Sequence, residues 1–130
     1  MNFEKVVFGF FVLLAATLNF GFWIGDIGDL RVHNTLELYA AVVVNLVATV
    51  LKFGDRTQIG AVHLATSLVA DIQLIGAAAV YIWASQAGHA HTVESVSTMV
   101  SLSGGALFAN VVSVVLLIIE MLKPREGMRI

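Results

Sequence analysis

Asp71 is the residue whose position in this chain most directly implies chemistry. It lies in an apolar run from Thr57 to Gln86 that contains no other formal charge and is long enough to cross a bilayer. A carboxylate at that depth costs roughly 2.5–3.5 kcal/mol on insertion scales, so it must face protein or water rather than lipid. Asp71 is therefore a candidate for binding a cation or for relaying a proton.

Polar and small side chains recur every three or four residues on several segments, and such residues share one helical face. Around Asp71 the row is Gly60, His63, Ser67 and Asp71, and in the preceding apolar segment it is Glu37, Ala41, Asn45 and Thr49. A third row contains Ser97, Ser101, Gly105, Ala109 and Ser113, with Asn110 beside it. Small-residue rows commonly form helix packing and oligomer contacts. The rows around Asp71 and Asn45 can alternatively line an ion pathway.

Three of these polar residues are expected at one depth. Asn45, Asp71 and Asn110 each fall near the middle of an apolar segment, at a rise of about 1.5 Å per residue. Two side-chain amides that donate to Asp71 would favour its charged form, whereas burial without them would favour its neutral form. A fixed anion would bind cations, and a titrating carboxyl group would relay protons. The sequence leaves both alternatives open.

A group of carboxylates is expected at one mouth of this arrangement. Glu37 lies one turn inside its segment, and Asp26, Asp29 and Glu94 lie in or beside the connections at the same side. Acidic rings raise the local cation concentration in many cation pathways. The alternative is that these carboxylates only solvate loops.

The histidines and glycines do not predict an enzyme or a cofactor site. His89 and His91, with His33, could approach a divalent ion, but two histidines in a Gly/Ala loop are usually solvated. His63 is interpreted as a hydrogen-bonded residue between helices or as part of a polar path from Asp71. An aspartyl dyad would need a second chain, because Asp71 is the one aspartate inside an apolar segment. We expect no catalytic residue, no metal and no cofactor.

The composition is that of a membrane protein. Of 130 residues, 58% are hydrophobic and 12% are charged, against about 25% charged in soluble domains, and the mean hydropathy is +0.90. The net charge of −2 gives no reason to expect a nucleic-acid partner. The absence of cysteine excludes disulfides and thiolate sites.

Four segments have the roughly 20 apolar residues that a membrane-spanning helix needs. They cover about residues 3–24, 34–53, 57–86 and 94–122, in a single domain of residues 1–130. The runs lack the alternation of a membrane β-barrel. The first run is too long for a signal peptide and has no cleavage site after it, so we interpret it as a retained span.

Basic residues predict how the spans are oriented. Six of the seven Lys and Arg residues fall on one side: Lys5, Lys52, Arg56, Lys123, Arg125 and Arg129. Because cytoplasmic loops are enriched in Lys and Arg, we expect four antiparallel spans with both termini in the cytoplasm. The tight turn at Gly54–Arg56 predicts a hairpin between spans two and three, with Asp55 as a cap for the third helix.

Two central blocks carry a resemblance to a known family. Leu51-Lys-Phe-Gly-Asp-Arg-Thr-Gln-Ile-Gly60 and Ala65-Thr-Ser-Leu-Val-Ala-Asp-Ile-Gln-Leu74 resemble a family of small bacterial inner-membrane proteins with four predicted helices and no assigned function. The opening Phe8-Gly-Phe-Phe and Leu18-Asn-Phe-Gly-Phe are similar to it too. The resemblance implies a multi-pass protein of the bacterial inner membrane and implies no chemistry.

From these features we expect an all-α bundle of four membrane helices that assembles as a homo-oligomer. The leading expectation is a channel or pore for monovalent or divalent cations, with Asp71, Asn45, Glu37, Thr49, Ser67, His63 and Asn110 on or near the pathway. The alternative is a non-conducting accessory subunit or scaffold. A small proton-coupled transporter is a third possibility, but such proteins use an accessible carboxylate in the first helix, and Val6–Ile24 has none.

Overall fold

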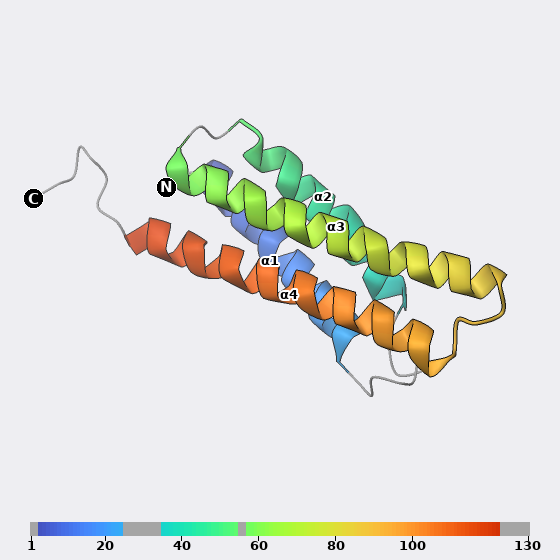
Figure 1. The fold of residues 1–130 in the computed structure, drawn as a ribbon. Coiled ribbons are helices and arrows are strands. Elements are labelled where there is room, and N and C mark those ends of the chain that lie inside the picture. Colours follow the sequence, from blue (N-terminus) through green and yellow to red (C-terminus); the bar gives the residue numbers. More distant parts are fainter. Residues whose placement is uncertain (1–2, 25–34, 55–56, 123–130) are drawn as a thin grey trace, which may run out of the picture.

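The structure, a computed structural model, describes residues 3–24, 35–54 and 57–122 of the chain, and these residues form an all-helical bundle (Figure 1). The helices are α1 (Phe3–Trp23), α2 (Thr35–Lys52), α3 (Gln58–Gln86) and α4 (Val93–Leu122). Their bounds differ by at most one residue from the apolar segments expected from the sequence. Apolar length was therefore sufficient to locate the helices.

All four helices are long and apolar enough to cross a membrane. They contain 21, 18, 29 and 30 residues, which at 1.5 Å per residue correspond to about 27–45 Å. The hydrocarbon core of a bilayer is about 30 Å thick, so α1 and α2 match it closely. The helices α3 and α4 are longer than this thickness and must tilt or extend beyond it.

Local capping fixes the ends of the two long helices. The Thr57 hydroxyl accepts a hydrogen bond from the Gly60 N–H at 3.0 Å, so Thr57 is the N-cap of α3. The expected cap, Asp55, lies outside the described residues. The chain leaves α3 through Gly88, whose φ of 81° favours glycine, and the Thr92 hydroxyl accepts from the Ser95 N–H at 3.2 Å at the start of α4.

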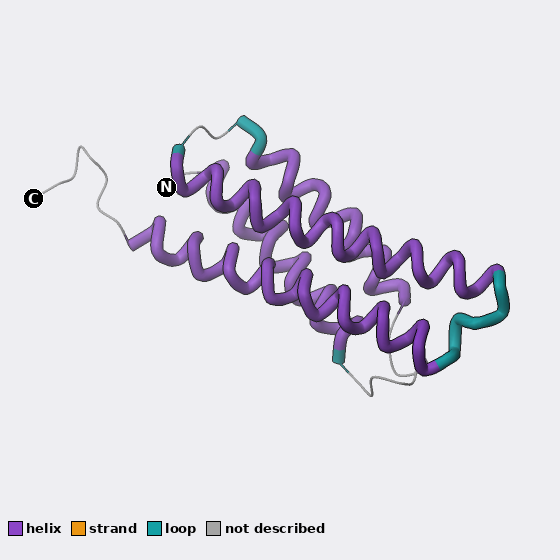
Figure 2. Tube along the Cα trace, viewed as in Figure 1, coloured by secondary structure: helices purple, strands orange, loops and turns teal. Residues whose placement is uncertain are grey.

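The helices pack in a ring in which α1 contacts α2 and α4, and α3 contacts the same two helices. The connection at residues 87–92 lies at the opposite end of the bundle from the end of α2 and the start of α3 (Figure 2). Side-chain pairs give the register between neighbours. Lys5 near the start of α1 pairs with Glu120 near the end of α4, and a Cβ at Gly104 would lie 2.8 Å from the Trp23 indole nitrogen.

The interior contains two apolar clusters with polar side chains between them. The larger cluster includes Phe22, Leu38, Leu74 and Met99, and the smaller one consists of Phe8, Val12, Ala48 and Leu117. On α2, Ala41 belongs to the larger cluster and Ala48 to the smaller one, with the buried Asn45 between them. The bundle therefore has a buried polar layer near its middle.

Candidate functional site

Asp71 is buried and accepts hydrogen bonds on both carboxylate oxygens. Asn45 Nδ2 donates to Oδ1 at 2.6 Å, and Thr49 Oγ1 donates to Oδ2 at 2.6 Å. Asn45 Nδ2 also donates to the Ser67 carbonyl at 3.2 Å, as a two-proton amide nitrogen can. We call Asn45, Thr49, Ser67 and Asp71 the Asp71 cluster. It joins α2 to α3 at mid-bundle.

The sequence spacing explains this geometry. Asn45 and Thr49 are four residues apart on α2, and Ser67 and Asp71 are four residues apart on α3, so each pair lies on one face. All four side chains are buried, and Asp71 is 6% exposed. The carboxylate is therefore directed at α2 of its own chain.

The expected partners of Asp71 were half right. The hydrogen bond from Asn45 is confirmed. The expected bond from Asn110 is wrong, because Asn110 Nδ2 has no hydrogen-bond partner among the described residues. Thr49 provides the second donor, since its position one turn after Asn45 places its hydroxyl beside the same carboxylate. The position of a residue along its helix did not show whether the second donor would come from α2 or from α4.

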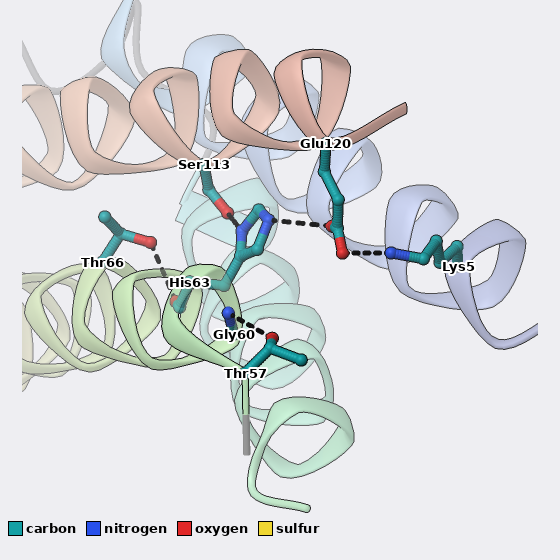
Figure 3. A network of polar contacts seen from close by, with 7 residues as sticks. All are labelled: Lys5, Thr57, Gly60, His63, Thr66, Ser113 and Glu120. Atoms are coloured by element: carbon teal, nitrogen blue, oxygen red, sulfur yellow. Dashed lines mark hydrogen bonds and ion pairs between the residues drawn. The ribbon is translucent and has the colours of Figure 1, made fainter. Parts of the chain in front are cut away.

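A second polar group lies nearer the end of the bundle where α1 begins and α4 ends (Figure 3). We call it the Glu120 cluster: Lys5, His63, Ser113 and Glu120. His63 Nδ1 lies 2.9 Å from Ser113 Oγ, and His63 Nε2 lies 3.8 Å from Glu120 Oε1. The other carboxylate oxygen of Glu120 pairs with the Lys5 ammonium group. The side chains are 0% exposed at His63, 14% at Glu120 and 35% at Lys5, so the cluster leads from the buried interior to the surface.

Aromatic and basic side chains from α1 and α2 close the other side of His63. The Phe8 ring meets the imidazole edge-on, with centroids 5.1 Å apart and an interplanar angle of 76°. The Lys52 ammonium group lies over the same Phe8 ring, 4.4 Å from its centroid, and the Lys52 side chain is buried. All four helices therefore contribute to the surroundings of His63.

Sequence reasoning did not identify Glu120 as a site residue, and it read Lys5 and Lys52 only as orientation signals. A usable signal was present. Lys5 lies at the start of the first apolar segment and Glu120 at the end of the fourth, so a bundle that brings those ends together must pair opposite charges. The pairing depends on how α1 and α4 pack against each other, and the sequence did not give that packing.

The expected row on α4 divides between two roles. Ser113 and Ala109 are buried, and Ser113 contacts His63 of α3. A Cβ on Gly105 would lie 2.5 Å from Gln73 Nε2, so this glycine lets α3 and α4 approach closely. Ser101 is exposed and Ser97 half-buried. The half of the row nearer the end of α4 therefore packs inside the chain.

Several buried amide groups have no hydrogen-bond partner within the described part of the chain. They are both polar atoms of the Asn19 side chain, Gln73 Oε1 and Asn110 Nδ2. Asn19 is four residues before Trp23 on α1, and Trp23 and Gln73 approach the adjacent glycines Gly104 and Gly105 of α4. These contacts place Asn19 near the level of Asp71 and Gln73 just beyond it, whereas the contact of Ser113 with His63 places Asn110 between the levels of Asp71 and His63.

The expected acidic mouth is described only in part. Asp26, Asp29 and His33 lie outside the described residues. Glu37 is half-buried and lies against α1, where a Cβ on Gly21 would collide with its carboxylate, and Glu94 is exposed. His89 and His91 are exposed, and the described residues contain no group of three His, Asp or Glu side chains that could hold a metal ion.

The chain matches a known family model. Residues 32–121 match the family of unknown function DUF6394, which covers well over half of the chain. The chain belongs to this family. The match includes α2 and α3 and almost all of α4, and hence every residue of the Asp71 cluster, whereas Lys5 precedes it. No curated protein and no solved structure was found to match the chain.

Proposed function

We propose that this protein is a cation channel or pore of the bacterial inner membrane that acts as a homo-oligomer. The observation that carries the proposal is the Asp71 cluster, in which a carboxylate near mid-span is held by two donors from a neighbouring helix. A buried carboxylate at membrane depth is expensive and by default marks an ion or proton pathway.

The proposed topology is antiparallel, with both termini and the α2–α3 connection in the cytoplasm. Three side-chain pairs support it: Lys5 with Glu120, Ser113 with His63, and Asn45 with Asp71. In each pair, the two residues lie at positions that adjacent helices of opposite direction would bring together. Lys5 and Lys52 then lie at the cytoplasmic end, as the charge bias requires.

The proposed pathway runs inside each bundle. Because Asp71 faces α2 and is 6% exposed, its carboxylate does not provide a ring of charges on an outer face of the chain. The pathway instead passes the Asp71 cluster and continues along the α3 row through Ser67 to His63. Glu37 would attract cations at the outer end, and the exposed Ser101 region of α4 is the proposed contact between copies.

Cation flux into liposomes that contain the purified protein tests this function. Asp71→Asn keeps the size of the side chain and removes its ability to carry negative charge. We expect flux from the wild-type protein and a large loss in Asp71→Asn. Equal flux from the two proteins, or none from the wild-type protein, would contradict the proposal.

One observation favours a second candidate, a non-conducting accessory subunit or scaffold. Both oxygens of Asp71 are engaged by donors within the chain, as in a purely structural tie between helices. Under this alternative the purified protein is a stable monomer, no ion crosses, and Asp71→Asn changes only which membrane proteins co-purify with it.

A further inference from the structure

We infer that the cation is the proton, that Asp71 carries it at mid-membrane, and that it reaches the aqueous phase through His63 and Glu120. The inference rests on the cation transport proposed above and names the ion. It starts from the single proton of the Thr49 hydroxyl, which has two acceptors within reach: Asp71 Oδ2 at 2.6 Å and the Asn45 carbonyl at 2.9 Å.

This arrangement satisfies Asp71 in both of its protonation states. When Asp71 is ionised, Thr49 donates to Oδ2. When Oδ2 is protonated, it donates to Thr49 Oγ1, and the Thr49 proton turns to the Asn45 carbonyl. The bond from Asn45 Nδ2 to Oδ1 stays in both states. Asp71 can therefore gain and release a proton while its neighbours keep their positions.

The same cluster is poorly built for a dehydrated metal cation. Such an ion needs several oxygen ligands in place of its hydration shell. Here the amide nitrogen of Asn45 points a hydrogen at the carboxylate, so it would repel a cation seated against Oδ1. A proton needs only one acceptor at a time and a donor beside it.

The Glu120 cluster provides the route from the interior to water. A protonated His63 transfers its Nε2 proton to Glu120 Oε1, through a small side-chain movement or one water across the 3.8 Å gap. This step leaves a neutral imidazole and a carboxylic acid. The acid then releases the proton to bulk water, and the carboxylate restores its ion pair with Lys5. The exposed fraction of the side chain rises from 0% at His63 to 14% at Glu120 and 35% at Lys5.

The charged groups around His63 come from the three other helices. Lys5 on α1 pairs with Glu120, and Lys52 on α2 lies over the Phe8 ring that contacts the imidazole. Glu120 is thus the acceptor that faces His63 from α4, with Ser113 fixing the other ring nitrogen.

Water completes the path between Asp71 and His63. Asp71 and His63 are two helical turns apart, about 12 Å, with Ser67 midway between them on the same face. Asn110 lies between the levels of Asp71 and His63, Asn19 and Gln73 lie near the level of Asp71, and all three present polar atoms without a partner in the described residues. Buried polar groups of this kind bind internal water in native proteins, and a water can pair with a donor and an acceptor at once.

The test measures proton entry into proteoliposomes with an internal pH-sensitive dye, driven by a potassium diffusion potential set with valinomycin. His63→Gln and Glu120→Gln keep polar side chains but cannot pass the proton on. We expect each to reduce proton flux on the order of 100-fold, as loss of a positioned proton-transferring group does. His89→Gln and Glu4→Gln, which change exposed side chains, are the matched controls and should retain wild-type flux.

Thr49→Val and Thr49→Ser test the Asp71 cluster separately. Valine keeps the shape of threonine without its hydroxyl, so proton flux should fall, whereas serine restores the hydroxyl and should restore the flux. If Thr49 had a purely structural role, variants that fold to the same yield would show the same proton flux, and serine would have no loss to restore. Replacing H2O with D2O should also slow the wild-type flux, which requires no variant.

The outcomes separate this inference from the function it rests on. Wild-type liposomes that pass K⁺ or Na⁺ but no protons, or proton flux unchanged in both His63→Gln and Glu120→Gln, would overturn the inference and leave cation transport standing. Liposomes that pass no cation of any kind would overturn both. Proton flux that depends on His63, Glu120 and the Thr49 hydroxyl would support it.

Discussion

Asn45 Nδ2 lies 2.6 Å from Asp71 Oδ1 and 3.2 Å from the Ser67 carbonyl, so one amide group of α2 binds both a side chain and the backbone of α3. Such a pair fixes the register of the two helices, since a shift by one turn would break both bonds. The stability of the α2–α3 pair and the proposed proton pathway therefore both depend on the hydrogen bond between Asn45 and Asp71.

A double-mutant cycle of Asn45→Leu and Asp71→Leu should show positive coupling. Asn45→Leu leaves Asp71 Oδ1 without its donor, and Asp71→Leu leaves the Asn45 amide without its side-chain acceptor, whereas the double variant removes both groups. Side-chain hydrogen bonds in membrane bundles couple by about 0.6–1.7 kcal/mol, and we expect the upper part of that range because the acceptor is a carboxylate. Reversible unfolding in detergent with increasing SDS measures it. Additive effects would show that the bond does not contribute.

Gly104→Ala should destabilise the bundle, because the new Cβ would lie 2.8 Å from the Trp23 indole nitrogen and 3.2 Å from its ring carbon. A rigid ring cannot move aside as the end of a flexible chain can, and overpacking of this kind costs about 1–3 kcal/mol. Gly54→Ala is the control, since no atom lies within 4 Å of its added Cβ. Equal unfolding midpoints of the two variants would contradict the close contact between α1 and α4.

Single cysteines should report the proposed four-span topology, because the natural chain contains no cysteine. Gly54→Cys and Ala87→Cys place a thiol at exposed positions at opposite ends of the bundle. In intact cells, a membrane-impermeant maleimide should label only Ala87→Cys. Both variants should react once the membrane is opened. Labelling of both positions from outside would rule out this topology.

Asn19→Leu should raise the free energy of unfolding if nothing pairs with the Asn19 amide. Both of its polar atoms are buried without a partner in the described residues, and a buried unpaired polar group costs about 1–3 kcal/mol. A variant that is less stable than the wild-type protein would instead show that Asn19 has a partner, such as bound water.

The sequence by itself determined the helices and much of the polar layer. Apolar length fixed α1 to α4 because a bilayer span needs a set number of apolar residues, and four-residue spacing placed Asn45, Thr49, Ser67 and Asp71 on two facing rows. The cost of a charge at membrane depth was enough to single out Asp71 before any contact was known.

Only the tertiary structure decided which rows meet. The sequence predicts Asn110 at the depth of Asp71, yet Thr49 binds Asp71 and the contact of Ser113 with His63 places Asn110 closer to the level of Ser67. Periodicity gives the face of a helix, but not its rotation or its shift along a neighbour. The Glu120 cluster likewise depends on how the helices pack against one another. Lys5, His63 and Glu120 are separated by more than 50 residues from one another, and only the packing of three helices brings their charges together.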